Sequence, residues 1–176
     1  MGNQKMGRRA SISDLTAGDK KLLCDLVLSY ISDRVLSIHG NGHDWHHGNS
    51  ELFLSRHRQY LAGLESFLVG TGNGRFTPLP KWDPGVEIPS EFSVAKASDT
   101  GRVRPPLQNL NPKMPVPTHL RAPNLCQISS GDALAVAIEG WHGQVHVAVG
   151  GAMESISIAP AAPIFWCWHA FIDDIY

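Results

Sequence analysis

Apolar residues recur at helical spacing in the first seventy residues of the chain, in two separate segments. The first segment follows Thr16, which forms with Asp19 a pattern resembling a helix capping box, and it continues to about Ile38. The second opens at Ser50 and ends at Gly70, where a glycine-rich stretch follows. These patterns predict one helix from residue 17 to about residue 38 and another from residue 50 to residue 70.

Two further helical patterns lie in the last third of the sequence. The third predicted helix begins at Ser130, has Asp132 in its first turn, and ends near Gly150-Gly151. The fourth begins at Pro163, a residue that suits the first turn of a helix, and continues through the apolar run that follows.

The residues between these two pairs of helices have a different character. Eight of the twelve prolines lie between Pro84 and Pro123, and no helical or strand period persists there. The sequence therefore predicts a mainly α fold: an irregular four-helix bundle with long loops, formed by a single domain over residues 1–176. Within it we expect a flexible tail at residues 1–12 and a proline-rich surface loop at residues 84–128.

Composition excludes several classes of protein. A formal net charge of −1 gives no reason to expect a nucleic-acid partner. The three cysteines are far apart and odd in number, which argues against a zinc ribbon or a disulfide framework. No apolar run is long enough to cross a membrane, and the basic N-terminus is not followed by the apolar stretch of a signal peptide. We therefore expect a cytoplasmic protein, although export together with a partner protein stays open.

Histidine is the unusual component, with nine residues. His142 and His146 are four positions apart, so their side chains share one helix face and could bind one metal ion. The zinc protease motif with this spacing requires a glutamate where this chain has Gly143. A single histidine pair with this spacing is more often part of an ordinary helix surface than of a metal site. A second group of histidines in apolar surroundings favours a metal site, and imidazole ligands suit copper, zinc, iron or nickel.

Several stretches resemble the tyrosinase and catechol oxidase family of type 3 copper proteins. The first copper motif of that family is matched by His47-Gly48 and by the run from Phe53 to Leu61, and the stretch Pro80-Lys81-Trp82-Asp83 matches its next conserved motif. The second copper motif is matched by Glu139-Gly140-Trp141, by the two histidines His142 and His146, by Gly150-Gly151-Ala152-Met153, and by the run from Ala162 to Asp173. The bacterial members are the most similar.

The resemblance implies two copper ions, dioxygen as co-substrate, and a phenol or catechol, free or as a peptide tyrosine, as substrate. His39, His47 and His57 would bind the first copper, with His43 as the competitor of His39. His142, His146 and His169 would bind the second, and Glu139 matches the catalytic glutamate. His46 is then a neighbour of a ligand, and His119 a surface residue. A copper-delivery partner protein is compatible with this picture.

Three departures from the family pattern limit what the resemblance implies. Ala162 replaces an aspartate, Trp168 replaces a histidine, and Gly143 replaces an asparagine that helps the glutamate to deprotonate a phenol. Oxidation of catechols is therefore the expected reaction, and hydroxylation of monophenols stays open. The alternatives are a dioxygen- or copper-binding protein with little oxidase activity, in which Trp168 blocks the substrate, and a dinuclear zinc hydrolase.

Overall fold

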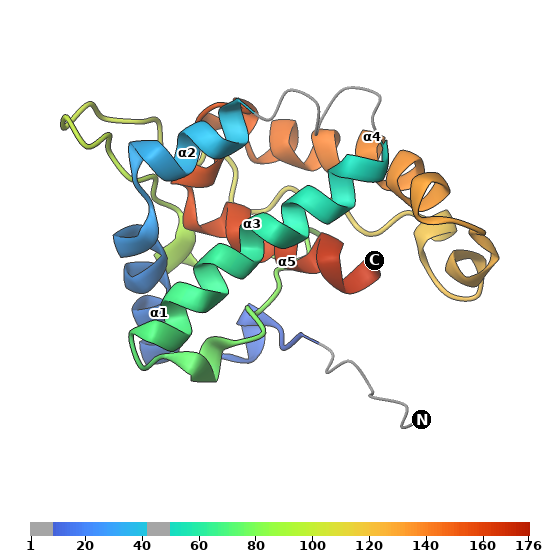
Figure 1. The fold of residues 1–176 in the computed structure, drawn as a ribbon, viewed down its shortest axis with the longest axis horizontal. Coiled ribbons are helices and arrows are strands. Elements are labelled where there is room, and N and C mark those ends of the chain that lie inside the picture. The colour runs from blue at the N-terminus through green and yellow to red at the C-terminus, as the bar shows by residue number, and fades with distance from the viewer. Residues whose placement is uncertain (1–8, 42–49) are drawn as a thin grey trace.

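The computed structural model describes residues 9–41 and 50–176 and is mainly helical (Figure 1). No strand occurs among these residues. Five α-helices are present: α1 (Ala17–Tyr30), α2 (Asp33–Gly40), α3 (Ser50–Gly70), α4 (Gly131–Val149) and α5 (Pro163–Ile175). Short 3-10 turns connect them.

Four helices, α1, α3, α4 and α5, begin where the sequence predicts, and local hydrogen bonds or backbone geometry explain three of these starts. The Thr16 hydroxyl accepts a 3.1 Å hydrogen bond from the backbone N–H of Asp19 at the start of α1. The Ser130 hydroxyl accepts one of 3.2 Å from the N–H of Ala133 at the start of α4. Pro163 occupies the first position of α5, where its missing N–H costs nothing.

The prediction of one continuous helix from residue 17 to residue 38 is wrong. The chain is extended at Ile31, and α2 starts afresh two residues later. Ser32 causes the restart, because its hydroxyl accepts a 3.2 Å hydrogen bond from the N–H of Val35. The bundle therefore has five helices instead of four, and the last turn of α2 brings the buried His39 to His57 and His169.

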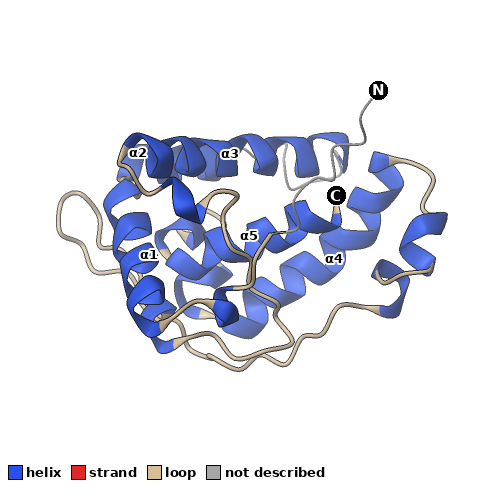
Figure 2. Ribbon diagram, turned by 90° about the horizontal axis from the view of Figure 1, so that it is seen from below, coloured by secondary structure: helices blue, strands red, loops and turns tan. Residues whose placement is uncertain are grey.

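Helix α5 is the central element of the bundle. Figure 2 shows it between α3 on one side and α4 on the other. All of its residues from Pro163 to Ile172 are buried, which explains why this segment is apolar around its whole circumference. A side chain carried by α5 can therefore meet side chains from both neighbouring helices.

The proline-rich segment is irregular, as predicted, but it is not only a surface loop. Ile88, Phe92 and Leu120 are each at most 2% exposed and belong to the core. Ile88 lies in irregular backbone, whereas Phe92 and Leu120 lie in separate 3-10 helices. Their spacing therefore follows no period, and a search for periodicity could not recognise them as core residues.

The part of the predicted flexible tail that the structure describes is packed. Ile12 is fully buried, and its backbone N–H donates a 2.9 Å hydrogen bond to the carbonyl of Lys81. Arg9 forms ion pairs with Glu65 on α3, at 2.6 Å, and with Asp173 on α5, at 2.7 Å. The expectation of flexibility is therefore wrong for residues 9–12.

Two consecutive glycines end α4, as predicted, and both have positive φ. Gly150 has φ +68° and Gly151 has φ +64°. A Cβ on Gly151 would lie 1.9 Å from the carbonyl oxygen of Pro106, so only glycine fits. The pair turns the chain into the 3-10 helix Gly151–Glu154, which returns along the last turn of α4.

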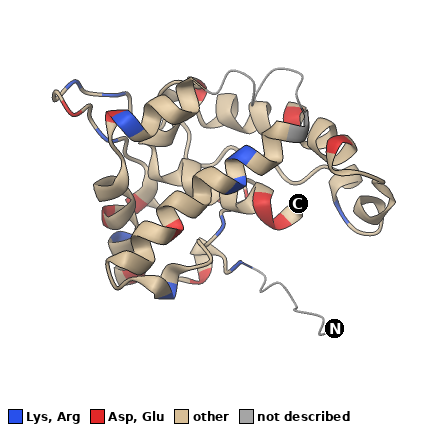
Figure 3. Ribbon diagram, in the orientation of Figure 1, with Lys and Arg blue, Asp and Glu red and all other residues tan. Residues whose placement is uncertain are grey.

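Charged residues of both signs are scattered over the helices and loops (Figure 3). Among the helices that the structure describes, none is both long and apolar enough to span a membrane.

Candidate metal centre

Histidines from four helices meet at the centre of the bundle. The last turn of α2 contributes His39, α3 contributes His57, α4 contributes His142 and His146, and α5 contributes His169. All but His146 are at most 6% exposed, and His146 is half-buried. Five of the six histidines that the sequence proposed as metal ligands therefore lie together.

Backbone carbonyl groups hold four of these rings in place. Each carbonyl oxygen accepts a hydrogen bond from the Nδ1–H of one ring, which fixes the orientation of that ring. The pairs are His39 with Ile156 at 2.8 Å, His57 with Phe53 at 2.6 Å, His146 with Met153 at 2.8 Å, and His169 with Phe165 at 2.8 Å.

The ring nitrogens form two overlapping groups, each small enough to hold a metal ion. One group is His39, His57 and His169, and the other is His142, His146 and His169. Within each group the candidate ligand atoms lie within 4.8 Å of one another. His169 belongs to both groups because α5 passes between α3 and α4, and its ring stacks on that of His57 with centroids 4.6 Å apart.

The second group is well suited to a cation. The carbonyl at each Nδ1 requires a hydrogen there, so the Nε2 atoms of neutral His146 and His169 carry lone pairs. His142 Nε2 lies 3.1 Å from the first and 3.0 Å from the second, and it can share a hydrogen with only one of them. A metal ion among the three nitrogens would replace the remaining lone-pair repulsion with ligand bonds.

Protonation is not an alternative way to relieve this repulsion. Burial, and then the four neighbouring imidazoles, lower the pKa of His169 well below its ordinary value. His169 is therefore neutral at physiological pH, which is the form that binds a metal ion.

The remaining histidines divide into two sets. His43, His46 and His47 lie outside the described residues, so the sixth proposed ligand, His47, and the competitor of His39 are not placed. His119 is exposed, as expected, and its Nε2 lies 3.3 Å from the carbonyl oxygen of Ala137. No cysteine belongs to either of the two ligand groups among the described residues.

Aromatic side chains enclose the histidines. The Phe165 ring lies 3.9 Å from that of His169, and Phe53 lies 4.9 Å from both His57 and His142. Trp168 is fully buried and stacks on His142, with an interplanar angle of 11°. This apolar surrounding limits the access of water and contributes to the burial that lowers the pKa of His169.

A cavity of about 370 Å³ opens above the histidines. His39, His142 and His146 line it, and Met153, Val147 and Ile156 supply apolar walls. Trp168 is not among the residues that line it. The tryptophan therefore lies beside His142 but does not form part of the wall of this cavity.

Glu139 also lines this cavity. It lies three residues before His142 and seven before His146 within α4, so the three side chains share one face of the helix. Gly143 lines the same wall, and a Cβ added there would meet nothing within 4 Å. The cavity thus brings a carboxylate and the candidate metal ligands to one small space.

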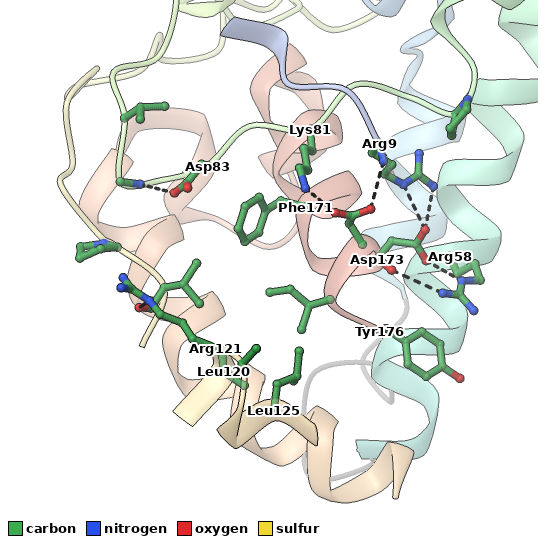
Figure 4. Close-up of a pocket in the computed structure, with 18 residues that line it drawn as sticks. Arg9, Arg58, Lys81, Asp83, Leu120, Arg121, Leu125, Phe171, Asp173 and Tyr176 are labelled. Carbon is green, nitrogen blue, oxygen red and sulfur yellow. Dashed lines mark hydrogen bonds and ion pairs between the residues drawn. The ribbon is translucent and has the colours of Figure 1, made fainter. Parts of the chain in front are cut away.

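A larger cavity, of about 930 Å³, lies near the end of α5 and has a different lining (Figure 4). Its charged side chains are largely paired, Arg9 and Arg58 with Asp173 and Lys81 with Asp174. None of the five clustered histidines lines it. We interpret its ion pairs as contacts that fix α5 against α3 and the segment around Arg9.

Sequence reasoning missed the groups that orient the rings and the second acid of the cavity. Phe53 and Phe165 each precede a histidine by four residues, a spacing at which an Nδ1–H can reach a helix carbonyl, so these two could have been found. Met153, Glu154 and Ile156 follow the Gly-Gly turn, and only the folded chain brings them back to α4.

Comparison with known proteins gives a consistent result. Residues 107–176 match the model of the common central domain of tyrosinase. This match covers α4 and α5 but not α2 and α3, so it includes His142, His146 and His169 but neither His39 nor His57.

Three similar proteins illustrate the relationship. The tyrosinase of Streptomyces lincolnensis is 33% identical over 125 residues, which cover 62% of this chain and 44% of that protein. The tyrosinase of Streptomyces glaucescens is 29% identical over the same shares of both chains. Tyrosinase-like protein 2 of Margaritifera margaritifera is 44% identical over 48 residues, 27% of this chain and 10% of that protein. The chain thus spans less than half the length of these relatives.

Proposed function

We propose that the chain is a type 3 copper protein of the tyrosinase family, an oxidoreductase that uses dioxygen to oxidise catechols to ortho-quinones. Two catechols lose two electrons and two protons each, and one dioxygen becomes two water molecules. The observation that carries the proposal is the convergence of five buried or half-buried imidazoles, from four helices, beneath a cavity that also contains a carboxylate.

The proposed copper ligands follow the two groups of histidines. His39 and His57 would hold the first ion together with His47, which lies outside the described residues. His142, His146 and His169 would hold the second. When bound, the copper pair would supply the two-electron chemistry by which dioxygen oxidises the catechol.

The chain's own side chains prepare the site for this reaction. The carbonyl groups of Ile156, Phe53, Met153 and Phe165 fix the rings, so little reorganisation is needed when ions bind. The low pKa of His169 keeps its Nε2 available as a ligand. The apolar cavity walls orient an aromatic ring above the histidines.

We assign the proton-accepting role to Glu139. A catechol must lose two protons during oxidation, and Glu139 is the carboxylate on the same helix face as His142 and His146. It would accept a phenolic proton directly or through a water molecule, as general bases do. Hydroxylation of a monophenol requires the deprotonated phenol to be held in a more precise position. Gly143 has no side chain that could contribute to this positioning.

The open cavity mouth extends the proposal to phenols carried on larger molecules. A tyrosine on a flexible peptide could enter because Val147 and Ile156 at the mouth are 63% and 45% exposed. A copper-delivery partner is part of the proposal only if the purified chain does not take up copper ions by itself.

Copper loading with parallel assays tests the proposed function. We expect about two coppers per chain by metal analysis, and quinone formation from 4-methylcatechol with dioxygen uptake. The His119→Ala variant, which alters an exposed histidine away from the cluster, should keep both properties. Binding of copper without dioxygen uptake would instead favour the alternative of a copper- or dioxygen-binding protein, and failure to bind copper would exclude both.

A further inference from the structure

The cavity above the histidines carries negative charge at its mouth. Glu139 on α4 and Glu154, at the end of the 3-10 helix that follows the Gly-Gly turn, both contribute to its lining. Its described lining contains no lysine or arginine.

The two ends of the cavity therefore differ in polarity. At the inner end lie the ring nitrogens of His39, His142 and His146, where metal ions would add positive charge. At the outer end lies the exposed side chain of Glu154, together with those of Val147 and Ile156. A phenol oxygen is attracted to the inner end, and a positive charge on the far side of the ring is attracted to the outer end.

The size of the cavity restricts what can bridge these two ends. Its volume of about 370 Å³ is near the lower limit of small-molecule sites, which begin at about 300 Å³. One aromatic ring with a short side chain fits, and the apolar wall formed by Val147, Met153 and Ile156 suits the ring faces. The mouth of the cavity can then distinguish between ligands by the charge of this short side chain.

We propose that this site selects phenols and catechols whose side chain is cationic, such as arylethylamines, and rejects those whose side chain is a carboxylate. The proposal rests on the proposed function for the reaction itself, but the selectivity comes from Glu154. A carboxylate at the mouth of a cavity whose described lining has no cation should discriminate between charges of opposite sign by roughly tenfold at low ionic strength, and by less in salt.

Three catechols with the same ring and similar tails provide the test. They are dopamine, which is cationic, 4-ethylcatechol, which is neutral, and 3-(3,4-dihydroxyphenyl)propionate, which is anionic. With the copper-loaded chain we expect kcat/KM to decrease in that order, with about a tenfold difference between cation and anion in low salt. We expect the same order for the binding constants measured without dioxygen, where no turnover occurs.

Variants identify the origin of the selectivity. Glu154→Gln should reduce the dopamine-to-propionate ratio severalfold. Glu87→Gln, which removes the same charge from an exposed position outside the cavity lining, should leave the ratio unchanged. A ratio near one in low salt, or an equal effect of both variants, would overturn the proposal. Failure to oxidise even 4-ethylcatechol would instead overturn the proposed function. In that case the order of the binding constants measured without dioxygen would still show whether the cavity selects ligands by charge.

Discussion

The Gly150-Gly151 turn offers the sharpest test of how the fold builds the metal centre. Replacing Gly151 by alanine places a Cβ 1.9 Å from the carbonyl oxygen of Pro106, at a position where φ is +64°. The left-handed conformation costs an L-residue about 1–2 kcal/mol. Moving backbone apart to relieve such an overlap costs about 1–3 kcal/mol more. The free energy of unfolding of Gly151→Ala should therefore be lower by about 2–5 kcal/mol.

Two other glycines provide graded controls. Gly150 has φ +68° and ψ −170°, a region almost restricted to glycine, but its added Cβ would meet mainly the flexible side chain of Gln108. Gly150→Ala should thus cost about 1–3 kcal/mol from backbone strain. Gly140 lies inside α4 with nothing within 4 Å of an added Cβ, so Gly140→Ala should stabilise the protein by about 0.5–1 kcal/mol.

Urea denaturation of the metal-free proteins, followed by circular dichroism, measures these differences through the midpoint and slope of unfolding. The expected order of stability is Gly140→Ala, wild type, Gly150→Ala, Gly151→Ala. Copper affinity should fall in Gly151→Ala as well, because the displaced turn carries the Met153 carbonyl that orients His146. A Gly151→Ala protein within about 0.5 kcal/mol of wild type would refute the reasoning, since no relaxed backbone could accommodate the overlap so easily.

Three further predictions concern the histidines and their helix. Gly143→Asn should raise the ratio of monophenol to catechol turnover, because its amide would lie one helical turn after Glu139 on the cavity wall; an unchanged ratio would show that the amide is not the missing group. His57→Ala should reduce copper content from about two ions to about one, measured by metal analysis, whereas His119→Ala should keep both; equal losses in the two variants would contradict the assignment. For His169, the lowered pKa means that the unfolded chain binds more protons than the folded chain below pH of about 6.5. The free energy of unfolding of the metal-free protein should therefore fall on acidification below this pH, by up to about 1.4 kcal/mol per pH unit for this group, and His169→Gln should show a smaller slope in urea denaturation at several pH values.

Local features of the fold follow directly from the amino-acid sequence. Ser130 and Pro163 fix helix starts through hydrogen bonds or backbone geometry within a few residues, so their patterns were sufficient. The same holds for the shared face of His142 and His146, which follows from the helical period. The break at Ile31 was missed because apolar spacing continues across it, although Ser32 carried the signal of a new helix start.

The assembly of the metal centre and of the core depends on how the helices pack. The meeting of His39, His57 and His169 depends on how α2, α3 and α5 pack, and on the break that directs α2 inward. The core positions of Trp82 and Phe92 follow no period, because irregular backbone places each side chain individually. Hydrogen bonds near in sequence are encoded locally, whereas the metal centre and the acidic mouth of its cavity arise from contacts between distant segments, which a linear pattern does not contain.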